Sequence, residues 1–475
     1  MKKKSILLFL VLCIGVLSSD AQQVWSLKQC IDYALKNNIQ IKQSQLNVDL
    51  AEMDLLQSKA AILPNLNGSA SHAYNYGRTV DMYTNQFATQ RVQSNNFYLS
   101  TNITVFNGFQ LLNTIMQNRL NLQASKFDVD KMMNDMSLNI ATAYLQILYN
   151  YELLDIAQNQ VKITQQQVDR MQKIVDVGNS AKGPLLTLQA QAASEDVQVV
   201  SAQNQLDLSF LTLTQMLDLD SAKGFDIEKP NIDMTNNKLL LTEPEKIFAY
   251  AVTNQPEIKS SEIKYESAVK GLNIAQSSRY PSLSFRASWG TGYSGASKKL
   301  SSMEPMGWDT IGITAEPTPV YVMSPSFSYN YKTTPFNDQI KDNENKSIGL
   351  YLSVPLFNNL RTSTAVKRAK INIQNADFNL QTAKNNLNKS VNQAYADAKA
   401  ALNKYNASQK AVDAMQESFK YAEQRFEAGM MNTTDYDDSK NKLTKAKSDL
   451  LQAKYEYVFR MKILDFYLGN PITLQ

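Results

Sequence analysis

Two stretches of 69 residues without glycine or proline constrain this 475-residue chain more than any other feature. They cover residues 109–177 and 360–428, and a glycine follows each of them, Gly178 and Gly429. A helix of this length would measure roughly 100 Å, several times the usual globular helix. Between residues 140 and 175, apolar side chains recur about every 3.5 residues, which is typical of a coiled-coil seam. The sequence therefore predicts two long helices packed in coiled coils.

The same order of elements occurs twice in the chain. Pro64 and Pro281 mark the same point of the pattern at an offset of 217, and Gly178 and Gly429 do so at an offset of 251. Recurring landmarks at fixed offsets indicate an internal duplication. Because the offset grows by 34 across the strands, the second half should carry a longer loop between its strands, at about residues 294–346.

Each repeat is expected to contain a helix, two strands, the long helix and a second shorter helix. The first repeat is residues 22–218, the second is residues 243–475, and residues 219–242 form a linker or equatorial segment between them. The expected elements are two strands within about 65–106, a long helix at 109–177 and a helix at 185–217, then two strands within about 282–357, a long helix at 360–428 and a helix at 435–468.

Short motifs predict where the first helix of each repeat begins and ends. Ser26 with Gln29 fits a capping box, in which two side chains satisfy unpaired backbone N–H groups, and Thr242 with Glu245 offers the same pattern in the second repeat. Pro64 ends the first of these helices because proline removes a backbone donor and clashes with the preceding turn. Residues 26–63 are therefore expected to be one helix.

The segments that follow these helices alternate apolar and polar residues, which indicates β-strands with one apolar face. Each strand is expected to have about 10–12 residues, the length that crosses a lipid bilayer when the strand is tilted. The apolar faces carry no charge, and aromatic residues lie near the strand ends, as in the aromatic girdles of membrane barrels. These residues are Tyr74, Tyr76, Trp289 and Tyr293.

Four strands are too few to close a barrel, and open sheet edges are not tolerated in lipid. Bacterial barrels have about eight or more strands, usually an even number, so three copies with twelve strands are a natural solution. The expected fold class is an α+β membrane protein, in which a trimeric 12-stranded β-barrel continues into a long α-helical coiled-coil barrel. The alternative is a soluble four-stranded sheet on coiled coils.

The N-terminus is predicted to be a signal peptide, residues 1–21. Lysines at positions 2–4 precede an apolar run at residues 6–17, and small residues stand before Gln22. A retained membrane anchor is the alternative, although the apolar run is short. Cleavage would lower the net charge from +4 to +2, and this balance argues against a nucleic-acid partner.

The composition offers no sign of catalytic or cofactor chemistry. Only Cys30 remains after cleavage, so no internal disulfide is expected. His72 is the single histidine, which excludes the common zinc spacings and leaves no plausible catalytic triad. With no phosphate loop or nucleophile elbow either, we expect no enzyme activity, no cofactor and no metal.

This layout resembles the TolC family of outer-membrane efflux channels over about residues 22–475. The resemblance rests on the duplicated order of elements, on the junctions at Pro64 and Pro281, and on the turn at residues 425–429, where an aromatic residue precedes a glycine and an acid opens the next helix. It implies a homotrimer in the outer membrane of a Gram-negative-type cell that extends into the periplasm. It also implies a periplasmic adaptor protein and an inner-membrane pump as partners, with the channel itself passive.

The resemblance also suggests site residues at the ends of the long helices. Gly178 and Gly429 match the tip glycines near which adaptor hairpins dock, and Asp435 and Asp438 match the paired gate aspartates. Their spacing of three puts both acids on one helix face, where three copies would ring a pore entrance and favour cations. The alternative is that these acids only stabilise the helix N-terminus. Asp437 is expected to be a solvated neighbour.

Three residues depart from the family pattern. Pro184 stands where an acid is frequent, Phe426 where tyrosine is common, and Met431 where the best-known gate has a basic residue. The closed-state latch is therefore expected to be built differently or to be weaker. Two other functions stay open, a secretion channel for polypeptides and a structural periplasmic coiled-coil protein without a pore.

Overall fold

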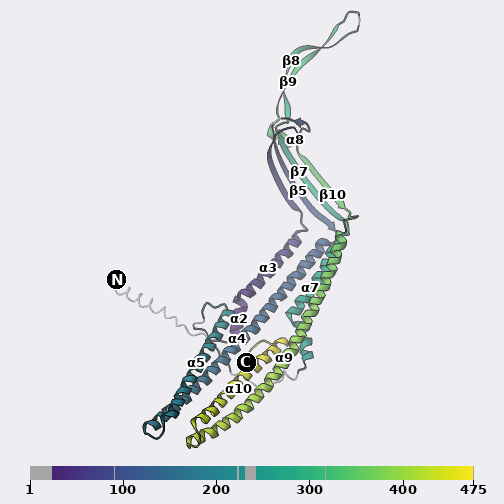
Figure 1. Ribbon diagram of the computed structural model, residues 1–475. Helices are drawn as coiled ribbons and strands as arrows, with labels where there is room; N and C mark the ends of the chain where they lie inside the picture. Colours follow the sequence, from purple (N-terminus) through teal and green to yellow (C-terminus); the bar gives the residue numbers. More distant parts are fainter. Residues whose placement is uncertain (1–23, 90, 222–223, 231–241, 316, 474–475) are drawn as a thin grey trace, which may run out of the picture. The chain divides into compact units, whose positions relative to one another are not determined.

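The computed structural model describes residues 24–89, 91–221, 224–230, 242–315 and 317–473. The expected signal peptide, residues 1–21, lies outside this part of the chain, and so does most of the expected linker. The chain forms two compact units. The first comprises residues 1–52, 119–267 and 373–475, and its described residues are mainly helical. The second, residues 53–118 and 268–372, holds the main β-sheet (Figure 1). No helix in the described residues combines the length and the apolar character needed to cross a bilayer.

Four helices of the first repeat have counterparts of the same length in the second. Their lengths are 11, 22, 67 and 35 residues in both repeats. The pairs are α2 (Leu27–Asn37) with α6 (Pro244–Asn254), α3 (Ile39–Ala60) with α7 (Pro256–Ser277), α4 (Gln110–Asp176) with α9 (Arg361–Glu427), and α5 (Lys182–Met216) with α10 (Thr433–Tyr467). The helices α4 and α9 lie where the glycine-free stretches predict them, one residue shorter at each end.

The single helix expected at residues 26–63 is wrong, because Asn38 divides it into α2 and α3. The Asn38 side chain accepts a hydrogen bond from the N–H of Gln40 (2.9 Å) and donates one to the carbonyl of Met216 (3.0 Å). Asp218 accepts from the N–H of Ile39 (2.9 Å). Side chains thus satisfy backbone groups on both sides of the break, which ties it to the end of α5.

The starts of two other helices also differ from the prediction. The expected capping box at Thr242 is absent, since Glu243 is the N-cap residue, makes no side-chain cap bond, and precedes Pro244 as the first helical residue. Helix α5 begins at Lys182 rather than 185, with Pro184 in its first turn. Proline is tolerated there because the first N–H groups of a helix have no intrahelical partner. The Ser26 capping box with Gln29 is confirmed.

Each strand-to-helix junction before a long helix has two successive residues with positive φ. Gly108 and Phe109 have φ of +64° and +66°, and Asn359 and Leu360 have φ of +51° and +62°. Left-handed backbone is uncommon for bulky residues, so the conformation of Phe109 and Leu360 is unfavourable for the isolated residues. A Cβ on Gly108 would lie 2.6 Å from the carbonyl oxygen of Ser277, so this position also lacks space for a side chain.

The second unit contains a four-stranded antiparallel sheet of order β10-β7-β5-β2. These strands are β2 (Asn65–Asn75), β5 (Val92–Asn107), β7 (Ser282–Ser294) and β10 (Asn345–Ser353). The strands β2 and β10 are the edges, so within the described chain the outer backbone groups of each meet no further strand.

The register places the predicted apolar rows of all four strands on one face of the sheet. Ile103, Phe285 and Leu350, for example, form one cross-strand row, and Leu350 is 68% exposed. The opposite face, which we call the polar face, consists mainly of serine, asparagine and glycine. Its central residues are Asn67, Ser69, Asn96, Tyr98, Ser100, Asn102, Ser284, Arg286, Ser288, Ser347, Gly349 and Tyr351.

Residues 294–346, expected to be a long loop, form regular structure instead. They contain the antiparallel hairpin of β8 (Lys298–Ile313) and β9 (Tyr321–Thr333), followed by α8 (Phe336–Asp342). Register shifts at residues 301, 306 and 311 each add one residue to β8. Each extra residue shifts the rest of β8 by one position relative to β9, so that Trp308 opposes Pro325 on one face of the hairpin. In the sequence, the extra residues interrupt the alternation of apolar and polar side chains, and β8 was therefore not predicted as a strand.

Helix α8 covers one end of the apolar face of the sheet. The Phe336 ring lies 6.4 Å from that of Phe97 and 5.6 Å from that of Tyr293. Gln339, which is buried, accepts a hydrogen bond from the N–H of Ser294 and donates to its carbonyl, both at 2.9 Å. The longer inter-strand segment is therefore anchored on the apolar face.

The shorter inter-strand segment, between β2 and β5, lies on the polar face instead. It contains β3 (Thr79–Val80) and β4 (Phe87–Ala88), which pair with each other. The buried Asp81 accepts a hydrogen bond from the Ser294 hydroxyl (2.5 Å), and the Tyr83 hydroxyl bonds to Asn96. A Cβ on Gly292 would lie 1.8 Å from the Tyr83 hydroxyl, so glycine is needed at this contact.

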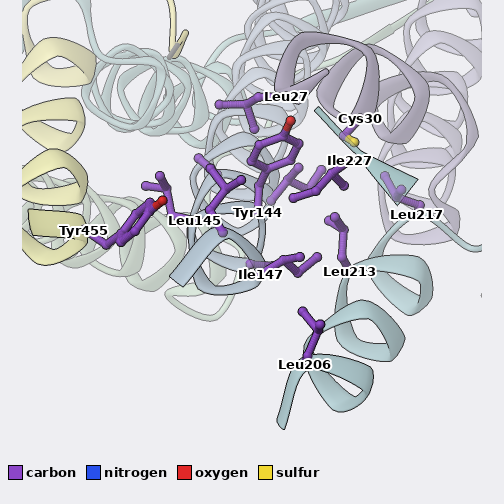
Figure 2. Close-up of a cluster of buried hydrophobic side chains, with 14 of the residues drawn as sticks. Leu27, Cys30, Tyr144, Leu145, Ile147, Leu206, Leu213, Leu217, Ile227 and Tyr455 are labelled. Carbon is purple, nitrogen blue, oxygen red and sulfur yellow. The ribbon is translucent and has the colours of Figure 1, made fainter. Parts of the chain in front are cut away.

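The core of the helical unit surrounds Tyr144 (Figure 2). Its hydroxyl donates to the carbonyl of Glu228 (2.7 Å) or Trp25 (3.1 Å), at the short parallel pair of β1 (Val24–Trp25) and β6 (Asp226–Ile227). Cys30 is fully buried in the same cluster, and burial raises the pKa of its thiol to about 12. The cysteine is therefore a packing residue, consistent with its place among apolar side chains.

Replacing Tyr144 with phenylalanine should lower the free energy of unfolding by about 1–3 kcal/mol, because it leaves a buried carbonyl without its donor. Denaturant unfolding followed by circular dichroism measures this loss. The control is Tyr421→Phe, at a side chain that is 60% exposed. Equal effects of the two substitutions would contradict a structural role for the Tyr144 hydroxyl.

Candidate functional site

The turns that close the two long helices flank a cavity in the helical unit. It has a volume of about 520 Å³ and is lined by α4, α5, α9, α10 and the turn before α10. Its apolar lining includes Met171, Ile174, Pro184, Leu188, Phe426 and Met431. Arg170 and Glu427, 3.6 Å apart, stand at its charged side. The cavity therefore lies between the helical hairpins of the two repeats and offers apolar surface beside charge.

Gly178 and Gly429 occupy equivalent positions in the two turns. Their φ angles are +75° and +72°, and each turn has the paired backbone hydrogen bonds of a Schellman motif. The N–H of Gly429, for example, donates to the carbonyl of Phe426 (3.0 Å), and the N–H of Met430 to that of Arg425 (2.8 Å). No atom lies within 4 Å of a Cβ built on either glycine, so the conformation alone requires glycine here.

The two candidate gate aspartates lie in the first turns of α10, and both are exposed. Asp435 belongs to the helix cap, since its N–H donates to Oδ1 of Asn432 (2.8 Å) and its carboxylate accepts from Nδ2 of the same asparagine (2.9 Å). Asp438 forms an exposed ion pair with Lys442 (2.6 Å). Asn432 is the N-cap residue, which the sequence analysis did not single out.

Tyr436 links the hairpins of the two repeats. Nε2 of Gln167 on α4 donates to its hydroxyl (2.6 Å), and its ring stacks on that of Phe426, with centroids 4.5 Å apart. The hydroxyl that position 426 lacks is thus supplied by the next helix. The sequence did not predict this contact, because the two acids that follow Tyr436 indicate an exposed, charged segment rather than a packed side chain.

A buried polar cluster joins three helices farther from the turns. Nζ of Lys440 on α10 lies 3.6 Å from Oε1 of Glu195 on α5, and both side chains are less than 5% exposed. On α4, the Lys440 ammonium also donates to the carbonyl of Gln160 (3.2 Å) and to the hydroxyl of Thr164. Breaking a buried pair costs more than breaking an exposed one, because the remaining charge is left without a partner.

A sequence signal for this cluster was available. Along α5, residues 188, 192, 195, 199, 202 and 206 follow the spacing of a coiled-coil seam, and Glu195 is the one charged member. A polar residue at a seam position usually has a specific buried partner. The sequence does not show which cation would pair with it, since Lys440 is 245 residues away.

The expectation that Asp437 is solvated is wrong, because its side chain is buried. It is only 8% exposed, and its Oδ1 has no hydrogen-bond partner in the described chain. Burial raises the pKa of its carboxyl to about 6, with Lys440 opposing this and Glu195 reinforcing it. The sequence placed Asp437 among exposed acids, but α10 turns it inward beside Lys440.

In the described residues, no group of three or more potential ligands could hold a metal ion.

Comparison with known proteins assigns the family. The model of the outer membrane efflux protein family matches residues 30–218 and 249–470. The chain therefore belongs to this family, and it is an efflux protein of the outer membrane. The structural periplasmic protein without a pore, which the sequence left open, finds no support here.

Relatives agree with this assignment. The chain is 23% identical over 462 residues to outer membrane protein TolC of Escherichia coli, a match that covers 95% of this chain and 84% of TolC. It is 19% identical over 443 residues to outer membrane efflux protein BepC of Brucella suis, covering 93% and 85% of the two chains. The solved structure of the outer membrane protein VceC from Vibrio cholerae has the same fold, with a TM-score of 0.73 and 16% identity over 94% of this chain and 96% of VceC.

The raised pKa of Asp437 predicts a pH-dependent stability. In the unfolded chain this carboxyl ionises near pH 4, whereas in the folded chain it holds its proton to about pH 6. Its contribution is therefore complete below pH 4 and lost as the pH rises through 6, by up to about 3 kcal/mol. Asp437→Asn should remove this loss and stabilise the protein at pH 7.5.

Thermal unfolding at several pH values between 4 and 8 tests this expectation. The Asp437→Asn variant should show a smaller decrease in midpoint with rising pH than the native chain. Asp438→Asn is the control, since that carboxylate is exposed and paired with Lys442. An unchanged pH profile in Asp437→Asn would contradict the assignment.

Proposed function

We propose that three copies of this chain form one continuous duct across the outer membrane and part of the periplasm. The single observation that carries this proposal is the open four-stranded sheet, which has an apolar face and two edges that pair with no further strand in the described chain. In lipid, unpaired backbone groups cost several kcal/mol each, so the edges need partners. Pairing β2 of one copy with β10 of the next keeps every neighbour antiparallel and closes a ring of twelve strands.

The chemical character of the two faces indicates which side of the sheet would contact lipid and which would face the lumen. The apolar face, with Leu350 and its neighbours exposed, would contact lipid, and the polar face would line the lumen. Trp289 and Tyr293 lie toward one end of β7, where an aromatic girdle would contact the bilayer interface. The helices of the three copies would continue the lumen as an α-helical barrel that conducts passively.

The cavity at the turns supports a docking role for the tips. We propose that a periplasmic adaptor protein, which connects the duct to an inner-membrane pump, binds at the turns of Gly178 and Gly429. The open space beside both glycines leaves their backbone accessible, and the apolar lining with a charged side suits a protein partner. Asp435 and Asp438 would then lie around the entrance and favour cations, in addition to the capping role of Asp435.

Membrane assembly can be tested with adjacent residues on opposite faces of β7. Ala287 lies on the apolar face and Ser288 on the polar face. Ala287→Arg should impair insertion and the formation of a heat-sensitive trimer, because arginine facing lipid costs about 2–4 kcal/mol near the midplane. Ser288→Arg should assemble normally. Membrane fractionation and gel migration with and without heating measure this, and a purely soluble, monomeric native protein would overturn the proposal.

The pore role of the two aspartates has its own test. In single-channel recordings the double substitution Asp435→Asn and Asp438→Asn should reduce cation preference, because it removes six carboxylates from a trimeric entrance. Asp413→Asn is the control, at an exposed position on α9 where Asp413 only accepts a hydrogen bond from Gln409. If selectivity is the same in all three proteins, Asp435 and Asp438 serve the helix cap alone.

A further inference from the structure

The four strands contribute a single formal charge to the polar face of the sheet, apart from the buried Asp81 carboxylate of the shorter inter-strand segment, which contacts Ser294 at the end of β7. The structure describes every residue of β2, β5, β7 and β10, and these strands contain no aspartate or glutamate. Their two basic residues lie on opposite faces. Arg286 of β7 opposes Asn102 and Gly349 on the polar face, whereas Lys346 of β10 opposes Trp289 on the apolar face. Arg286 therefore stands alone among serine, asparagine and glycine, with no carboxylate in the sheet to neutralise it.

Neighbours on both flanking strands hold the Arg286 side chain in place. Its Nε donates to Oδ1 of Asn102 on β5 (3.3 Å), and its guanidinium carbon lies 4.9 Å from the ring centroid of Tyr351 on β10. This cation–π contact leaves the charge of the guanidinium intact. The charge is thus fixed over the middle of three strands.

Gly349 makes room for this arrangement. It lies directly opposite Arg286, two residues before Tyr351 on the same face of β10. A Cβ on Gly349 would lie 3.2 Å from the Tyr351 ring, so the ring leans over the glycine toward the arginine. A glycine covered by a neighbouring aromatic ring is a known way to stabilise a strand that lacks a side chain. Here it also positions the ring beneath the cation.

We propose that Arg286 is a selectivity residue of the barrel lumen, where three copies form a positive ring that favours anionic solutes. This inference rests on the proposed trimeric duct. Rings of arginine or lysine favour anions in pores, as rings of acids favour cations. The ring would lie in the barrel and the acids at the helical entrance, so one duct would carry two rings of opposite sign. The solutes that the barrel ring attracts are small anions and anionic groups on larger substrates.

Reversal potentials of single channels in a salt gradient test this proposal. At about 10 mM salt the Debye length is about 30 Å, so the ring should be felt across a wide lumen, whereas at 1 M it should be screened. Arg286→Glu should raise the cation-to-anion permeability ratio, on the order of threefold or more at low salt. Arg286→Gln should have a smaller effect in the same direction, and Arg286→Lys should preserve the native ratio.

Two controls separate charge in the lumen from a structural role. Lys346→Gln removes a charge of the same sign from the neighbouring strand but from the apolar face, and should leave the ratio unchanged. Tyr351→Phe keeps an aromatic ring under Arg286 and should also leave it unchanged. Native gels confirm that each variant is a trimer.

The outcomes distinguish this inference from the function on which it rests. If the native protein forms trimers that conduct, but Arg286→Glu has the native permeability ratio at low salt, the selectivity role is wrong and the duct stands. An equal effect of Lys346→Gln would also overturn it. If the native protein neither forms trimers nor conducts, the duct itself is wrong.

Discussion

Left-handed backbone at a few fixed joints determines where the long helices begin and where the helices that follow them end. Each long helix begins after two residues with positive φ and ends at a glycine with positive φ, in both repeats. Asp218 and Gly469 repeat the device at the ends of α5 and α10, with φ of +54° and +77°. Because such conformations are unfavourable for most residues, these joints confine each reversal to one place and leave the segments between them uninterrupted. The equal lengths of α4 and α9, and of α5 and α10, follow from equally spaced joints.

Local rules predicted most of this architecture from the sequence. The absence of glycine and proline gave the extents of α4 and α9 within one residue at each end, and the period of two gave the apolar face of the sheet. The features that the sequence did not predict depend on contacts between residues far apart in the chain. Asn38 breaks a helix because Met216 and Asp218 lie beside it, and β8 was concealed because its bulges interrupt the alternation. For the candidate site, the turn glycines were predictable, whereas the inward orientation of Asp437 depends on helices distant in sequence.

Two ion pairs join the repeats, one close to the turns and one farther along the helices, and they differ in the free energy needed to break them. Arg170 with Glu427 is an exposed ion pair, and such pairs contribute little. Lys440 with Glu195 is buried, so separating these residues would leave charges in an apolar environment. Motion that parts the turns would therefore break the exposed Arg170–Glu427 pair at little cost, would also have to break the hydrogen bond between Gln167 and the buried Tyr436, and would meet the most resistance at the buried cluster. Opening that begins at the turns and ends at Lys440 would be the expected order.

The β8–β9 hairpin extends from the sheet without altering it. It is inserted where the ends of β7 and β10 already lie side by side, so it changes neither the register of the sheet nor the lengths of the helices. Closing a longer loop between ends that are already close adds little entropic cost. The β8–β9 hairpin can therefore gain or lose residues while the sheet, the helices and the anchored α8 stay unchanged.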